Sequence, residues 1–252
     1  SDVCSSDLGY LRMDTFNVQG LADVFDQAMD RLASTNALII DVRKNGGGDQ
    51  SGSHVIARLI NDRTVRYQVQ ERMTSFIYFD RPDVALNPQA DDAPGFAAWH
   101  DVAVQPAEPT YHGKPVVVLT SPRCFSACDT FTAGLKANGL ATVMGEATGG
   151  GTGSPLVFKL PITALSFRYS VVRGRTATGS WIEGHGTEPD VVVEPNEQTV
   201  RGLADNQLDQ AYAYLKNVLA QGPATSVAQQ VLTAHGSIYA TAQRGQALEE
   251  VL

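Results

Sequence analysis

The sequence lacks long apolar runs and a surplus of basic residues, and it contains few cysteines. No apolar stretch approaches the roughly 18 residues of a membrane-spanning helix, so no such segment is expected in these 252 residues. Lysine and arginine number 19 against 27 aspartate and glutamate, and the net charge of −8 argues against nucleic acid as the main partner. The 3 cysteines supply neither a disulfide framework nor a zinc site. What is present is a globular composition, with 43% hydrophobic residues for a core.

The first eight residues, SDVCSSDL, match the translation of a common sequencing adaptor. We therefore expect residues 1–8 to be non-native and the genuine chain to begin at Gly9, and we exclude the octapeptide from reasoning about the fold. Without it the net charge becomes −6, and the cysteines reduce to Cys124 and Cys128.

Short β-branched runs alternate with segments of helical periodicity along most of the chain. ALIIDVR and KPVVVLT are typical of buried strands, whereas apolar residues recur at helical spacing over residues 21–32. This alternation predicts an α/β fold in which crossover helices join parallel strands. Residues 80–113, rich in proline, alanine and aspartate, are expected to form a long surface excursion. Residues 220–252 are expected to be a partly helical C-terminal tail.

One turn holds three side chains that could act as nucleophiles. The stretch RCFSACD places Cys124, Ser126 and Cys128 between a predicted strand and the helical segment DTFTAGLKANG. Ser126 is suited to capping that helix. It is equally suited to nucleophilic attack, because the N–H groups and dipole of the first helical turn stabilise negative charge. The local sequence does not separate these two interpretations.

Two glycine-rich loops follow predicted strands, NGGG at residues 45–48 and GGGTG at residues 149–153. The first lacks the Lys-Ser/Thr of a P-loop and the spacing of a dinucleotide-binding fingerprint, so nucleotide binding is not favoured. A tight turn is the simplest interpretation. Consecutive glycines also let backbone N–H groups approach a ligand oxygen, which is the arrangement of an oxyanion hole.

Five blocks taken together resemble the C-terminal processing (tail-specific) serine peptidases, and most of all the branch represented by the tricorn core. In order they are GYLRMDTF, LIIDVRKNGGG, KPVVVLTSPRCFSACDTFTAGLKANG, ATVMGEATGGG and WIEGHGTEPDVVV. The turn FSACD matches the family's Ser-Ala-x-Glu/Asp nucleophile turn. The resemblance implies an α/β fold with a Clp/crotonase-like core of repeated ββα units. It also implies that residues 9–219 form a serine peptidase catalytic domain, truncated at its N-terminus.

The resemblance assigns a role to each candidate site residue. Ser126 would be the nucleophile, and Glu183 would support its base. The backbone N–H groups of Gly48 and Ala127 would form the oxyanion hole. The remaining loop glycines would shape the substrate cleft: Gly46, Gly47, Gly149, Gly150 and Gly151.

The general base is the open part of this assignment. Many family members use a lysine where this chain has Gly151, so a Ser-Lys dyad is not expected. The tricorn-like branch uses a histidine that would lie upstream of Gly9, and we expect the given sequence to lack it. His54 and His185 are the alternatives within the chain, and structural roles are favoured for both.

Four other residues are expected to be structural. Cys124 and Cys128 occupy positions where the family often has small residues, and they are expected to be compact buried packing residues. A reactive Cys128 is the alternative. Asp41 and Arg43 are expected to hold the end of a strand by ion pairing or hydrogen bonds.

The implied function is a serine-type endopeptidase that cleaves unstructured or C-terminal segments of polypeptides. Its partner would be a polypeptide substrate, with no metal and no organic cofactor, and exported relatives point to the periplasm or cell envelope. Two alternatives remain: a non-catalytic module that binds peptides or apolar ligands on the same fold, and acyl-CoA chemistry on the same core. A histidine upstream of Gly9 would favour the enzyme over the binding module.

Overall fold

The computed structural model describes residues 8–72, 95–163 and 165–221. Its strands and helices, in chain order, are β1 (Leu8–Arg12), α1 (Leu21–Leu32), β2 (Ala37–Asp41), α2 (Gly52–Leu59), β3 (Thr64–Glu71), β4 (His100–Val104), β5 (Val116–Thr120), α5 (Ala127–Ala137), β6 (Thr142–Gly145), β7 (Leu156–Lys159), β8 (Ser166–Tyr169), β9 (Val172–Thr176), β10 (Val191–Val192), α6 (Glu197–Val200) and α7 (Asn206–Gln221). None of the described helices is long and apolar enough to cross a membrane.

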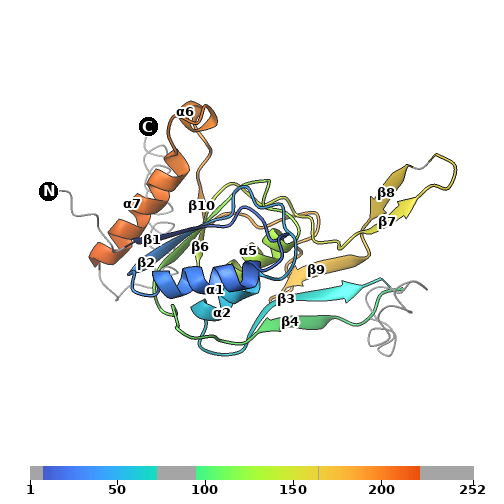
Figure 1. Cartoon of the computed structure of the whole chain (residues 1–252), viewed down its shortest axis with the longest axis horizontal. Helices are drawn as coiled ribbons and strands as arrows, with labels where there is room; N and C mark the ends of the chain where they lie inside the picture. Colours follow the sequence, from blue (N-terminus) through green and yellow to red (C-terminus); the bar gives the residue numbers. More distant parts are fainter. Residues whose placement is uncertain (1–7, 73–94, 164, 222–252) are drawn as a thin grey trace, which may run out of the picture.

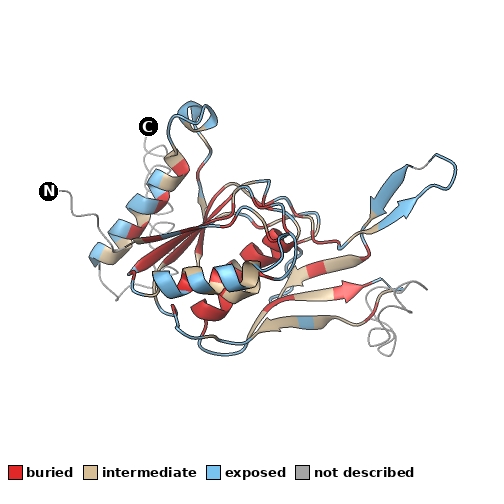
Figure 2. Cartoon of the chain, viewed as in Figure 1, coloured by how far each residue is buried: buried red, intermediate tan, exposed pale blue. Residues whose placement is uncertain are grey.

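A parallel sheet of order β1-β2-β5-β6-β10 forms the centre of the molecule, with helices on both faces (Figure 1). Successive strand residues point to opposite faces. Leu38 and Ile40 of β2 therefore join the core formed with α1, α2 and α5, whereas Ala37 and Ile39 pack with α7. Strands covered on both sides are apolar throughout, which is why β2 and β5 could be predicted from the sequence (Figure 2).

A second, antiparallel sheet of order β4-β3-β9 packs on α5. Because α5 contacts both sheets, it is buried from Ala127 to Leu135. This burial fixes the start of α5, where the candidate nucleophile lies. The remaining two strands, β7 and β8, form a hairpin that projects away from the rest of the protein (Figure 1).

The α/β fold with parallel strands is confirmed. Residues 80–113 were expected to form a long surface excursion, and the described part of them contains the strand β4, which pairs with β3. Pairing with a strand distant in the sequence overrides the local composition. Residues 1–7, 73–94 and 222–252 lie outside the described part, so the adaptor and tail predictions and the part of the excursion before residue 95 are untested.

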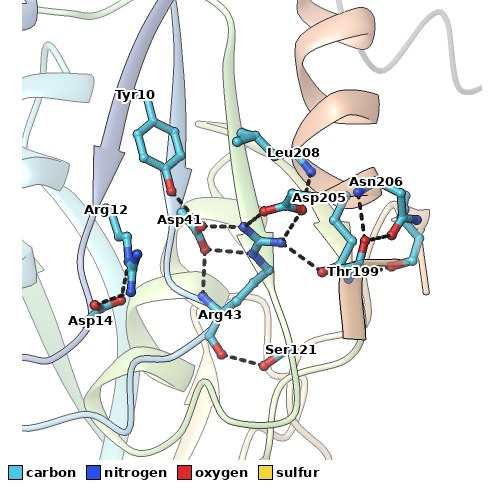
Figure 3. Close-up of polar contacts among 12 residues, drawn as sticks. Tyr10, Arg12, Asp14, Asp41, Arg43, Ser121, Thr199, Asp205, Asn206 and Leu208 are labelled. Carbon is cyan, nitrogen blue, oxygen red and sulfur yellow. Dashed lines mark hydrogen bonds and ion pairs between the residues drawn. The ribbon is translucent and has the colours of Figure 1, made fainter. Parts of the chain in front are cut away.

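Arg43, just after β2, connects the central sheet to α7 (Figure 3). Its guanidinium contacts Asp41 at 2.6 Å and Asp205 at 2.7 Å, and Tyr10 donates a hydrogen bond of 2.9 Å to Asp41. Burial opposes ionisation of Asp41, but the hydrogen bonds and charge of Arg43 outweigh it and lower the pKa of that carboxyl. Hydrogen bonds from Arg43 likewise lower the pKa of Asp205. The structural role expected for Asp41 and Arg43 is confirmed.

We predict that Arg43→Met lowers the free energy of unfolding by about 3 kcal/mol, because it leaves buried Asp41 without its cation. Both carboxylates have depressed pKa values when folded, so their contribution is complete above the ordinary value of 3.8. It is lost as pH falls through the lower folded values. In thermal unfolding between pH 7 and pH 2, the melting temperature of the wild type should therefore fall more steeply with decreasing pH than that of Arg43→Met.

The exposed pair Arg12–Asp14 provides a matched control, since it also joins an arginine to an aspartate two residues away (Figure 3). Both of its side chains are about half exposed, at 48% and 49%. Arg12→Met should therefore change the melting temperature little. Equal losses in the Arg12 and Arg43 variants would contradict the role assigned to Arg43.

Candidate active site

Ser126 sits at the turn between β5 and α5 in a backbone conformation that non-glycine residues rarely adopt. It is the N-cap residue of α5, with φ 59° and ψ −120°, and its side chain makes no capping hydrogen bond. A non-glycine residue at positive φ costs about 1–3 kcal/mol and persists only where the surroundings enforce it. The capping interpretation of Ser126 is therefore not supported, and its hydroxyl is available for another purpose.

Cys124 and Cys128 form a disulfide that encloses this turn. Both are fully buried, as expected, but the expectation that they are simple packing residues is wrong. The turn before α5 brings their Cα atoms within 5.2 Å, a separation that a disulfide can span, which sequence spacing alone did not reveal. A disulfide-bonded Cys128 has no free thiol, so the structure does not support the reactive-cysteine alternative.

The first glycine loop lies directly against the Ser126 turn. The Phe125 N–H donates to Asn45 O at 3.1 Å, and a Cβ placed on Gly47 would lie 2.6 Å from Ser126 Cβ and 2.9 Å from Ala127 N. Gly47 also has a φ of 94°, which disfavours any other residue. Glycine is therefore required for the loop to approach the turn this closely.

Two backbone N–H groups beside Ser126 lack acceptors within the described residues. Gly48 is bracketed by hydrogen bonds of its neighbours, in which Phe16 N–H donates to Gly47 O and Asp49 N–H donates to Phe16 O. The N–H of Gly48 itself binds nothing in that part of the chain. The same holds for Ala127, the first residue of α5, as expected for the first turn of a helix.

Asp129 ties the second glycine loop to the first turn of α5. Its fully buried carboxylate accepts hydrogen bonds of 2.9 Å from the N–H groups of both Gly150 and Gly151. Burial raises the pKa of Asp129 above its ordinary value, although hydrogen bonds from Thr148 and the loop act in the opposite direction. Asp129, the acidic residue of the FSACD turn, therefore holds the second glycine loop against the start of α5.

Glu183 is held in a fixed orientation by residues of two other segments. Its carboxylate accepts hydrogen bonds from the N–H and the hydroxyl of Thr152, the latter at 2.8 Å, and from the Ser170 hydroxyl at 3.4 Å. A Cβ on Gly153 would lie 2.0 Å from Ser170 Oγ and 3.1 Å from Glu183 Oε1. Glycine at position 153 is what leaves room for this arrangement.

These elements surround one cleft of about 730 Å³. The sequence-predicted residues that line it are Ser126, Glu183, Gly46, Gly47, Gly48 and Gly151. The other three predicted residues are not in the lining. Ala127 is buried in the core, and Gly149 and Gly150 face Phe125 and the segment around Gly186. Sequence reasoning missed Thr15, Asn17, Phe125, Arg168 and Ser170, which also line the cleft.

No histidine or lysine is among the described residues that line the cleft. His54 contacts Asp26 at 2.8 Å between α1 and α2, and exposed His185 contacts the backbone oxygen of Glu183 at 3.0 Å. At position 151, a Cβ would lie 1.8 Å from Cζ of Phe125. The Phe125 ring thus occupies the space that a lysine at this position would need.

The model of peptidase family S41 matches residues 7–193. Tricorn protease homolog 1 of Streptomyces coelicolor is 27% identical over 228 residues, which cover 86% of this chain and 17% of that protein. Mature CPAF superposes with a TM-score of 0.72 at 18% identity, covering 87% of this chain and 53% of that one. The photosystem II D1 C-terminal processing protease gives a TM-score of 0.55 at 26% identity, covering 74% and 42%.

The expected fold, with its Clp/crotonase-like core, is confirmed by these structural neighbours, and at 18% identity the CPAF likeness concerns the fold alone. The chain spans less than a fifth of the length of the curated relatives it matches.

Proposed function

This chain belongs to peptidase family S41, and from that membership we propose that the protein is a serine-type endopeptidase acting on unstructured or C-terminal segments of polypeptides. The proposal rests above all on Ser126. This residue is held at positive φ without a capping hydrogen bond, in a cleft that Gly48 also lines. A serine on a strained turn from a strand to a helix is also how α/β-hydrolases expose their nucleophile.

The chemistry of the proposed site follows from its parts. Ser126 Oγ attacks the scissile carbonyl carbon and loses its proton to a general base. The N–H groups of Gly48 and Ala127 then bind the oxyanion of the tetrahedral intermediate. The base returns the proton to the leaving amine, and water releases the acyl group from Ser126 in a second addition and elimination.

The base in this proposal is a histidine outside the described residues, which the family resemblance places upstream of Gly9. Glu183 would orient it and stabilise its charged form. This role agrees with the position of Glu183 in the cleft and with the hydrogen bonds from Thr152 and Ser170 that fix its carboxylate.

The proposal is tested by treating the full-length protein with a fluorophosphonate and mapping the adduct by mass spectrometry. We expect the adduct on the peptide that contains Ser126, because such probes require an activated serine. An adduct confined to another serine would refute the assignment. Absence of any adduct, combined with tight binding of unstructured peptides, would favour the non-catalytic binding module.

We predict that Glu183→Gln lowers kcat of the full-length enzyme about 10- to 100-fold without unfolding it. Removing a residue that orients the base lowers kcat less than removing the nucleophile does. The amide keeps the shape of the side chain but loses the charge that supports a protonated base. Steady-state kinetics and thermal unfolding measure the two effects.

Glu188→Gln is the matched control, since Glu188 is exposed in the same segment and is absent from the cleft lining. It should retain wild-type turnover. Equal turnover in the wild type and Glu183→Gln would remove Glu183 from the proposed site.

A further inference from the structure

The charged residues that line the cleft differ in how their charges are satisfied. Asp49, Arg168 and Glu183 are the charged members of that lining. Asp49 accepts a hydrogen bond of 2.8 Å from the N–H of Ser51, and Glu183 is bound by Thr152 and Ser170. The Arg168 side chain forms no ion pair and no hydrogen bond with any residue in the described ranges. It is therefore the one charged side chain of the described lining with neither a hydrogen bond nor an ion pair to those residues.

The register of the β7–β8 hairpin determines which way Arg168 points. Val157 pairs with Arg168, and Phe158 pairs with Phe167. Paired residues share one face of a hairpin and their sequence neighbours share the other. Arg168 therefore lies on the face opposite the stacked rings of Phe158, Phe167 and Tyr169.

The hairpin is rooted at the cleft and braced by those rings. Pro155 and Ser170, which flank its two strands, both line the cleft. The Phe158 ring stacks on Phe167 at 5.5 Å and on Tyr169 at 5.1 Å between centroids. The hairpin is otherwise largely exposed and extends outward from the body (Figure 2). Arg168 thus lines the cleft from a hairpin whose strands are held together by stacked aromatic rings.

A guanidinium in such a position matches a carboxylate, which it can bind through two parallel hydrogen bonds. A polypeptide in the cleft offers carboxylates of two kinds only, namely Asp or Glu side chains and the α-carboxylate at its C-terminus. We propose that Arg168 is a specificity-determining residue that binds a substrate carboxylate beside the scissile bond. This inference rests on the proposed peptidase function.

The test compares three fluorogenic peptides of otherwise identical sequence on the full-length protein. One is uncharged with an amidated C-terminus, the second carries a single Glu near the scissile bond, and the third has a free α-carboxylate instead. Arg168→Glu should lower kcat/KM about 10- to 100-fold for a carboxylate-bearing peptide and leave the uncharged peptide nearly unchanged. Whether the Glu peptide or the free-acid peptide is affected identifies the source of the carboxylate.

Lys159→Glu is the matched control. Lys159 lies on the same face of the hairpin, diagonally across from Arg168, but does not line the cleft. Lys159→Glu makes the same change of charge as Arg168→Glu and should lower kcat/KM for the carboxylate-bearing peptide much less. Equal effects of the two variants, or an equal loss for all three peptides, would overturn the proposal.

Binding to the Ser126→Ala protein separates this inference from the peptidase proposal. In fluorescence anisotropy, the labelled carboxylate peptide should bind at least about tenfold more weakly when Arg168→Glu is added to Ser126→Ala. Equal affinities would refute the role of Arg168, whatever the outcome of the fluorophosphonate experiment. Labelling of Ser126 that fails while this affinity difference persists would refute only the peptidase function.

Discussion

Ser126→Ala is expected to reduce peptide turnover by the full-length protein by a factor on the order of 10⁶. The hydroxyl it removes is the group that would form the covalent intermediate. The other hydroxyl side chains of the described cleft lining, Thr15 and Ser170, do not stand at the start of a helix or at positive φ. The fold should survive, because the hydroxyl makes no capping hydrogen bond. Steady-state hydrolysis of a disordered polypeptide and thermal unfolding measure the two expectations.

Ser154→Ala is the control for this substitution. Ser154 is the other described non-glycine residue at positive φ, with φ 39°, but it does not line the cleft. It should therefore retain turnover. Wild-type turnover in Ser126→Ala would show that the peptide bond is attacked by another group and would refute the proposed mechanism.

Gly48→Ala is expected to cause the second-largest loss, affecting stability and turnover together. The added Cβ would lie 2.1 Å from the carbonyl carbon and 2.3 Å from the oxygen of Phe16, at a φ of 141°. Backbone atoms cannot move aside as a flexible side chain can. We expect the free energy of unfolding to fall by about 3 kcal/mol and kcat to fall about 10²- to 10³-fold as the Gly48 N–H is displaced.

The same loop contains its own control. A Cβ placed on Gly46 would meet no atom of the surrounding described residues within 4 Å, and the φ of Gly46 is not positive. Gly46→Ala should therefore keep the melting temperature of the wild type. If Gly48→Ala unfolds at the same temperature and turns over peptide at the same rate, the close approach of the loop to Phe16 has no functional role.

The sequence allowed the central layers of the fold to be predicted because burial leaves a simple pattern there. β2 and β5 are buried at every position, and α1 repeats its apolar residues at helical spacing. The second sheet was not predicted in full. Along β3 the sequence TVRYQVQE does alternate polar and apolar residues. In the structure, however, buried and half-buried residues occur in pairs and the buried positions include Arg66 and Gln70, so burial does not follow that alternation.

The candidate site was predictable where backbone demands select the residue type. Two glycine loops and a serine between a strand and a helix can be recognised directly in the sequence. The structure brings Ser126, Gly48 and Glu183 to one cleft. Arg168 was not predicted, because only the pairing of β7 with β8 decides which face it shares. Phe125 was missed for a similar reason, since its contact with Gly151 joins two segments that are separate in the sequence.

The central sheet arranges its strands in the order in which a ribosome makes them, from β1 at one edge to β10 at the other. Each emerging strand can therefore dock on an edge that is already complete, without insertion between earlier strands. The helix α7, which supplies Ala211 and Leu215 to cover Ile39 and Val117, is synthesised after every strand of that sheet. One apolar face of the nascent protein thus stays open to chaperones until translation has passed residue 221.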